Sequence, residues 1–288
     1  MKLESASPSV TFIMMGYQKA GNVMKSDYHC HSDHSPDSVV TMREHCEKAL
    51  ELGLQELCFT DHLDYGIKYV YPEGKEFSYE TYFKGIEEVR EAYRGRLVIK
   101  TGIEFGAQIH TLQHYRNDYQ QLPFDFILLS SHEIDNQEFW RHDYQKGKTQ
   151  FEYNRGYYQN LLEMVKAYDG YSVLAHLDVM KRYDQAGIMD DEYVIDLIEL
   201  ILKEVIKSGR GLEVNTSCVR YRLNDLTPSK RILKLYRDLG GSILSLGSDA
   251  HQVGQLGDHM EDIRQQLREL GFTHFYTYDK LKPIPHLL

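Results

Sequence analysis

Short apolar segments alternate along this chain with stretches of helical pattern, and this alternation is the strongest constraint on its fold. Several of the segments are near-continuous runs of Val, Ile, Leu and Phe, as expected where a strand is buried on both faces. Strands that alternate with helices predict an α/β fold with a parallel sheet, either closed into a barrel or left open. The predicted strands are Lys25–His29, Glu56–Thr60, Leu97–Ile103, Phe126–Ser130, Ser172–His176, Gly211–Asn215 and Ser242–Leu246.

Helical stretches fill the intervals between these strands. Thr41–Leu52 opens with a Thr, has Glu44 three positions later in the pattern of a capping box, and is followed by Gly53. A long loop is expected over 64–77, and no repeat or linker divides the chain after residue 24. We therefore expect one domain over 24–288, preceded by an extension over 1–23 that is disordered or derived from an expression leader. The other predicted helices are Ser78–Tyr93, Tyr153–Tyr168, Asp191–Lys207, Pro228–Leu239 and His259–Leu270.

The composition fits a single large α/β domain and argues against some partners. The 288 residues are 42% hydrophobic, which is enough for a substantial core, and carry a net charge of −10 that disfavours a nucleic acid partner. No apolar run reaches the roughly 18 residues that a membrane span needs. The four cysteines, Cys30, Cys46, Cys58 and Cys218, form no CxxC pair, so we expect reduced thiols in a cytoplasmic protein. The oligomeric state stays open, a homo-oligomer included.

Metal-binding residue types recur at one structural position, the carboxyl end of a predicted strand. In a parallel barrel these ends open on one face, so residues far apart in the sequence converge on one pocket. Any single one of them would more often be a hydrogen-bonded structural residue, but the joint pattern predicts a site. Residues i and i+2 of a strand point the same way, which pairs His29 with His31 and Asp249 with His251. The full set is His29, His31, His62, Glu104, His132, His176, Asp249 and His251.

The predicted ligands are imidazoles and carboxylates without a clear thiolate. This donor set suits Zn, Mn or Fe in a catalytic site. It holds more ligands than one ion uses, so we expect two or three divalent metal ions, with Glu104 able to bridge two of them. A site with several ions activates a hydroxide and clamps anionic oxygens, which is what the hydrolysis of a phosphate ester requires.

These residues resemble the PHP (polymerase and histidinol phosphatase) family. Within it the stand-alone histidinol-phosphate phosphatases are the most similar, through the stretches His176–Tyr183 and Glu213–Ser229. The resemblance implies a distorted seven-stranded (β/α)7 TIM-like barrel, a trinuclear metal centre, and hydrolysis of L-histidinol phosphate in histidine biosynthesis. The matching motifs are Asp27–His31, Phe59–His62, Gly102–Glu104, Ser130–His132, Ala175–His176 and Gly247–His251.

The resemblance also implies how the ions share their ligands. A residue shortly after the HxH pair would complete the third ion, and Asp33, His34 and Asp37 are the candidates. The spacing favours Asp37 over His34, its main competitor. The implied sets are His29, His31, Glu104 and Asp249 for the first ion; Glu104, His132 and His176 for the second; and His62 and His251 for the third.

Catalysis and substrate binding can be assigned only as candidates. We expect a hydroxide held between the first two ions to attack phosphorus, with Asp249 and His251 as catalytic residues and Asp249 as the proton carrier. A phosphate monoester favours a bidentate arginine, and an aromatic ring such as that of Trp140 could stack on the substrate. The candidates for the phosphate are Arg155, Arg182 and Arg220, and those for the substrate ammonium are Glu133 and Asp135.

Three other functions share parts of this pattern. The same fold could act on another phosphomonoester, a phosphodiester or a nucleotide. PHP-like domains also occur as non-catalytic parts of DNA polymerases, although this chain lacks a polymerase region. Amidohydrolases that act on C–N bonds share the HxH start but usually use a carboxylated lysine on a middle strand, where this chain has Glu104.

Overall fold

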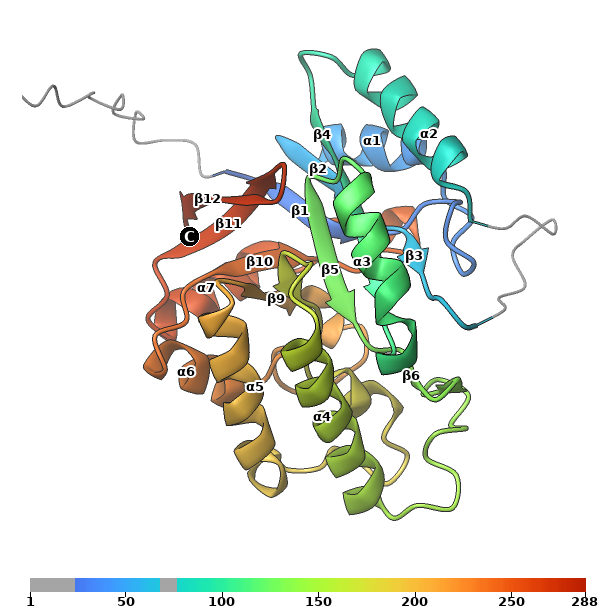
Figure 1. Ribbon diagram of the computed structural model, residues 1–288. Helices are drawn as coiled ribbons and strands as arrows, with labels where there is room; N and C mark the ends of the chain where they lie inside the picture. The colour runs from blue at the N-terminus through green and yellow to red at the C-terminus, as the bar shows by residue number, and fades with distance from the viewer. Residues whose placement is uncertain (1–23, 68–76) are drawn as a thin grey trace, which may run out of the picture.

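The computed structural model describes residues 24–67 and 77–288, which form a barrel of parallel strands with helices around it (Figure 1). The predicted extension over 1–23 and most of the loop predicted over 64–77 lie outside the described residues. Neighbouring barrel strands are hydrogen-bonded in parallel throughout. In spatial order they are β1 (Ser26–Cys30), β2 (Glu56–Phe59), β4 (Val98–Gly106), β5 (Phe126–Ser130), β8 (Val173–Leu174), β9 (Gly211–Asn215) and β10 (Leu244–Gly247).

The first and last strands meet and nearly close the barrel. Cys30 forms a parallel bridge with Ala250, and the N–H of His31 donates to the carbonyl of Ala250 at 2.8 Å. The N–H of Asp249 donates to the carbonyl of His29 at 2.7 Å. The predicted seven-stranded α/β barrel is therefore confirmed, and its closure places the two i, i+2 pairs of the sequence side by side.

The predicted helices are present, with shifts at their ends. The capping box between Thr41 and Glu44 forms as predicted at the start of α1. The helix α4 begins at Gln150, earlier than the predicted Tyr153, because Thr149 and Glu152 form a second capping box. The helix α5 begins at Ile195, later than the predicted Asp191, because Asp191–Tyr193 form a separate 3₁₀ turn. These helices are α1 (Met42–Glu51), α2 (Tyr79–Ala92), α4 (Gln150–Ala167), α5 (Ile195–Lys207), α6 (Lys230–Asp238) and α7 (Met260–Glu269).

Several elements were not predicted. The helix α3 (Leu112–Gln121) is mostly polar and buries only Leu112 and Tyr115, so its sequence shows little helical periodicity. The hairpin of β11 (His274–Asp279) and β12 (Lys282–Leu287) packs at the amino-terminal end of the barrel, where the N–H of Tyr278 donates to the hydroxyl of Tyr28 at 2.9 Å. Three two-residue strands were also not predicted: β3 (His62–Leu63), β6 (Glu133–Ile134) and β7 (Gln137–Glu138).

Apolar and polar side chains occupy opposite ends of the barrel interior. Tyr28, Phe126, Leu128 and Tyr278 pack together near the hairpin as one buried cluster, while the histidines and carboxylates lie at the carboxyl ends of the strands. The barrel interior is thus packed with apolar side chains at its amino-terminal end and polar at its carboxyl-terminal end, which confines the chemistry to one face. None of the described helices is long and apolar enough to cross a membrane.

Candidate metal centre

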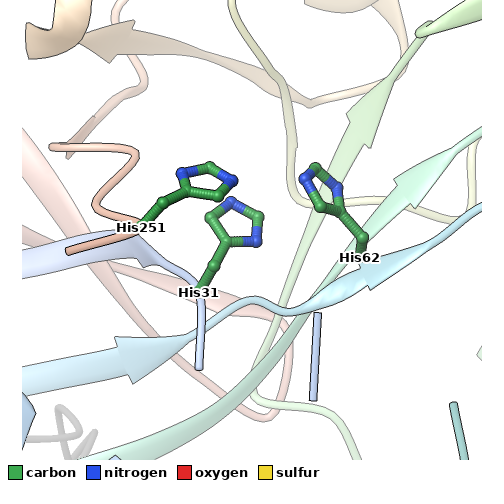
Figure 2. Close-up of side chains that lie close together, drawn as sticks. All are labelled: His31, His62 and His251. Atoms are coloured by element: carbon green, nitrogen blue, oxygen red, sulfur yellow. The ribbon is translucent and has the colours of Figure 1, made fainter. Parts of the chain in front are cut away.

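The structure brings the predicted ligands together from separate strand ends. Figure 2 shows three of them, His31, His62 and His251, whose imidazoles lie close together although they come from distant parts of the sequence. The ring of His31 lies 4.2 Å from that of His62 and 4.1 Å from that of His251, centroid to centroid. Convergence of this kind follows from the parallel barrel, because each strand delivers its last residues to the same face.

His29 and His31 present two ring nitrogens to one point. Their Nε2 atoms are 3.0 Å apart, and both residues are fully buried. Nδ1 of His29 hydrogen-bonds to Glu213 at 2.5 Å, and Nδ1 of His31 to the hydroxyl of Ser35 at 3.1 Å. With Nδ1 as the donor in each ring, both Nε2 lone pairs face each other. Such an arrangement requires a proton or a cation between them.

The pKa shifts of His29 and His31 also indicate a site for a positive charge. Burial lowers the pKa of His29, but the carboxylates of Glu213, Glu104 and Asp249 outweigh it and hold that pKa well above its usual range. Burial and the neighbouring imidazoles hold the pKa of His31 well below its usual range. The surrounding carboxylates therefore favour a positive charge at this pair, where a divalent ion would fit.

Glu104 turns its two oxygens toward two different groups of histidines. Oε2 lies 3.3 Å from Nε2 of His29 and 3.5 Å from Nε2 of His31. Oε1 lies 2.9 Å from Nε2 of His176 and 3.3 Å from Nε2 of His132. Burial would raise the pKa of this carboxyl, but the nearby histidines hold it well below its usual range. Glu104 is thus an anionic side chain with the geometry of a bridging ligand.

Asp249 completes the group around the first histidine pair. Its Oδ1 lies 3.5 Å from Nε2 of His29 and 3.4 Å from Nε2 of His31. Its backbone has a φ of 56°, a left-handed conformation that turns the side chain toward the pocket. Burial raises its pKa, but His29 and Arg182 together hold it well below the usual range.

A third group forms around His62 and His251. Oδ2 of Asp37 lies 3.1 Å from Nε2 of His251 and 3.6 Å from Nε2 of His62. The competing His34 points elsewhere, because its ring packs edge-on against Tyr82 of α2 at 5.5 Å between centroids. The structure therefore brings Asp37, and not His34, to this group.

Two carboxylates behind the histidines were missed by the sequence reasoning. Besides Glu213, which contacts His29, Oδ1 of Asp64 lies 2.7 Å from Nδ1 of His132. Carboxylates in this position fix the tautomer and the orientation of metal-binding histidines. A signal existed for Glu213, since it is a charged residue in the middle of a predicted buried strand, and its exposure in the structure is 0%.

A pocket of about 560 Å³ opens over these groups. Nη1 of Arg182 donates to Oδ2 of Asp249 at 2.8 Å, and its Nη2 donates to the hydroxyl of Ser217 at 2.8 Å. Nε of Arg182 has no hydrogen-bond partner among the described residues. Nη2 of Arg220 donates to the carbonyl of Asp249 at 2.8 Å. The pocket is also lined by Trp140, Arg141, Val179, Tyr183 and Tyr221.

Three substrate-binding predictions are not supported by these positions. Arg155 lies on α4 outside the pocket, where its guanidinium pairs with both oxygens of Asp196 on α5 at 3.0 and 2.8 Å. Glu133 is fully buried and does not line the pocket, and burial together with Asp64 raises the pKa of its carboxyl. Asp135 lies in the turn between β6 and β7, also away from the pocket. Of the other candidates, Arg182, Arg220 and Trp140 do line it.

Comparison with known proteins places this arrangement among related chains. The sequence profile of the PHP domain matches residues 27–217. A histidinol-phosphatase of Lactococcus lactis subsp. lactis is 28% identical over 270 residues, which cover 90% of this chain and 96% of that protein. A probable histidinol-phosphatase of Thermotoga maritima is 28% identical over 251 residues, which cover 86% of this chain and 93% of that protein.

A solved structure is similar over nearly the whole fold. The crystal structure of histidinol phosphate phosphatase from Lactococcus lactis subsp. lactis, in complex with zinc, L-histidinol and phosphate, superposes with a TM-score of 0.83. The two chains are 27% identical, and the match covers 91% of this chain and 100% of the other. Its bound groups are thus a metal, an amino alcohol and a phosphate.

Proposed function

The chain belongs to the PHP domain family, and from that membership and its site we propose that it is a metal-dependent histidinol phosphatase. It hydrolyses L-histidinol phosphate to L-histidinol and phosphate. The observation that carries this proposal is the position of Glu104, whose two oxygens face two groups of histidines beneath a pocket that an arginine enters. The similarity extends over nearly the full length of the relatives, so the proposal concerns the whole domain.

Two or three divalent ions, Zn, Mn or Fe, are the proposed cofactors. The buried imidazoles and carboxylates fit them, because the Nε2 atoms of His29 and His31 face each other and the carboxylates of Glu104 and Asp249 lie within 3.5 Å of both. When bound, such ions lower the pKa of water and neutralise the charge of phosphate oxygens. The proposed ligands are His29, His31, Glu104 and Asp249 for one ion; Glu104, His132 and His176 for the second; and Asp37, His62 and His251 for the third.

Arg182 and Arg220 are the proposed phosphate-binding residues. The guanidinium of Arg182 is only 5% exposed and is already held by Asp249 and Ser217, so little side-chain entropy is lost when a substrate arrives. Its Cζ lies 4.7 Å from the ring centroid of Tyr221, which supports the plane of the guanidinium from one side. A rigid arginine of this kind recognises a phosphate in one orientation.

Asp249 and His251 remain the proposed catalytic residues. Asp249 is the proposed proton carrier because its carboxylate lines the pocket directly beside the candidate ligands His29 and His31. Nδ1 of His251 lies 3.0 Å from the backbone carbonyl oxygen of Asp249 and 3.6 Å from its Oδ1, so the two residues are held beside each other. The aromatic rings of Trp140, Tyr183 and Tyr221 form a wall that suits the imidazole of the substrate. We place the reaction in the cytoplasm, where the four buried free cysteines stay reduced.

A substrate panel tests the proposal. Phosphate release is measured from L-histidinol phosphate, p-nitrophenyl phosphate, bis-p-nitrophenyl phosphate and a nucleoside monophosphate after loading with Mn, Zn or Fe. We expect kcat/KM for L-histidinol phosphate to exceed that for the generic aryl ester by at least about 100-fold, the discrimination that a site gains by pairing polar groups of the correct substrate. Equal values would leave a phosphatase of another specificity, and turnover of the diester alone would indicate a phosphodiesterase.

A further inference from the structure

A buried lysine, Lys181, lies between two carboxylates behind the pocket wall that carries Arg182. Its Nζ is 2.9 Å from Oδ2 of Asp178 and 2.8 Å from Oδ1 of Asp191. The three side chains are exposed by 10%, 0% and 8% respectively. The group is therefore an internal ion cluster, in which the loss of one partner leaves an uncompensated buried charge, and not a surface salt bridge.

Ser229 attaches a second segment to the same cluster. Its backbone N–H donates to Oδ2 of Asp178 at 3.0 Å, and its hydroxyl donates to Oδ2 of Asp191 at 2.5 Å. Ser229 ends the loop that follows β9 and caps α6. The cluster thus joins the 3₁₀ segment η3 (Val179–Tyr183), which contains Lys181, to the far end of this loop.

The loop that ends at Ser229 supplies much of the pocket wall. Its Ser217 accepts a hydrogen bond from Arg182, and its Tyr221 lies against the same guanidinium. Its Arg220 reaches the backbone carbonyl of Asp249. The two proposed phosphate-binding arginines, Arg182 and Arg220, therefore come from segments that the ion cluster joins to each other.

We propose that Lys181 is a positioning residue for phosphate recognition, because its ammonium fixes the two carboxylates to which Ser229 binds, at the end of the loop that carries Arg220. Lys181 does not line the pocket itself and acts only through these neighbours. The inference rests on the proposed function in one respect, since it assumes that the pocket receives a phosphate group. Burial lowers the pKa of Lys181, but the two carboxylates outweigh it, so the lysine stays charged.

The test compares Lys181→Met with wild type in the Mn-loaded protein. Titration calorimetry with inorganic phosphate gives the affinity without requiring turnover, and initial rates with L-histidinol phosphate give KM and kcat separately. We expect phosphate binding to weaken and KM to rise by about tenfold or more, as when one charge-assisted contact is misplaced, with metal content unchanged. A purely structural role would lower the melting temperature and the active fraction but leave both affinities as in wild type.

Three further variants make the test decisive. Lys203→Met is the matched control, because Lys203 pairs with Glu199 on the exposed side of α5 and is itself 52% exposed, so wild-type affinity is expected. Lys181→Arg keeps the charge and should recover part of the affinity. If Lys181→Met fails to fold, Asp191→Asn removes one arm of the cluster and should weaken phosphate binding by an intermediate factor.

The outcomes separate this inference from the proposed function. Phosphate affinity within about twofold of wild type in a folded Lys181→Met or Asp191→Asn protein overturns the positioning role, since it is less than the effect of a typical hydrogen bond. A wild type that binds phosphate but does not hydrolyse L-histidinol phosphate contradicts the proposed function, while the phosphate titration still decides the role of Lys181. A wild type that binds no phosphate contradicts both.

Discussion

Glu213 accepts a hydrogen bond from Nδ1 of His29 at 2.5 Å through one oxygen, and from the backbone N–H of His176 at 2.9 Å through the other. These two histidines face opposite oxygens of Glu104. One buried carboxylate on β9 therefore orients candidate ligands of two different ions. This explains why a charged residue occupies the middle of a fully buried strand.

Replacing Glu213 by Gln should weaken metal binding without unfolding the barrel. The amide can still accept one hydrogen bond, but it no longer raises the basicity of His29. We expect the affinity for the ions to fall about 10–100-fold, the usual effect of losing an outer-shell partner. This affinity is measured as the metal content that remains after dialysis against increasing concentrations of chelator. Glu199→Gln on the exposed face of α5 is the control. Unchanged retention of all ions would show that Glu213 has no role in the centre.

Replacing Glu104 by Gln should lower activity and metal content more than replacing Glu213, which contacts a candidate ligand rather than the ions. Gln has one carbonyl oxygen and no charge, so it cannot serve two groups of histidines at once. We expect activity to fall by more than the ~10–100-fold typical of outer-shell substitutions, together with a loss of at least one ion per chain by elemental analysis. Full metal content and near wild-type turnover in this variant are incompatible with a bridging role.

Replacing Arg182 by Lys should weaken substrate binding, seen as a higher KM, with only a small loss of fold stability. Lysine keeps the charge but loses the planar fork that contacts Asp249 and Ser217 together. One charge-assisted hydrogen bond contributes about 1.5–3 kcal/mol, so kcat/KM should fall about 10–100-fold. Arg155→Lys is the matched control, because Arg155 pairs with Asp196 outside the pocket. An equal loss in both variants would argue against a special role for Arg182.

Replacing Thr149 by Ala should destabilise the protein and leave catalysis unchanged. The Thr149 hydroxyl accepts the N–H of Glu152 at 3.3 Å, and the Glu152 carboxylate accepts the N–H of Thr149 at 2.7 Å. Losing such a cap costs about 1 kcal/mol, or roughly 2 °C in melting temperature for a protein of this size. Calorimetry measures the shift, and Thr149→Ser should retain most of the stability. A wild-type melting temperature in Thr149→Ala would mean that water replaces the cap at no cost.

Much of the barrel could be predicted from the sequence because its strands are buried on both faces. Phe126–Ser130 and Gly211–Asn215 have the predicted bounds. The helix α3 and the carboxyl-terminal hairpin were not predicted, since α3 buries few apolar residues and five of the six residues of β12 are exposed. Elements held mainly by tertiary contacts leave a weak local pattern.

The candidate site was predictable where a strand fixes the direction of a side chain. Strand alternation points His29 and His31 the same way, and the barrel brings Glu104 to them. Loop and helix residues lack that constraint. The choice between Asp37 and His34 depends on the path of a loop. The direction of the Arg155 side chain depends on the rotation of α4 about its axis, which here turns Arg155 toward α5.

The most direct test of the account is the dependence of L-histidinol phosphate hydrolysis on bound metal. Protein is stripped with chelator, and Mn, Zn or Fe is added back in steps while phosphate release and bound metal are measured on the same samples. The account predicts no turnover in the stripped protein and recovery that reaches its maximum only when two or three ions are bound per chain. Turnover that survives complete removal of metal, or full recovery with a single ion per chain, would contradict it.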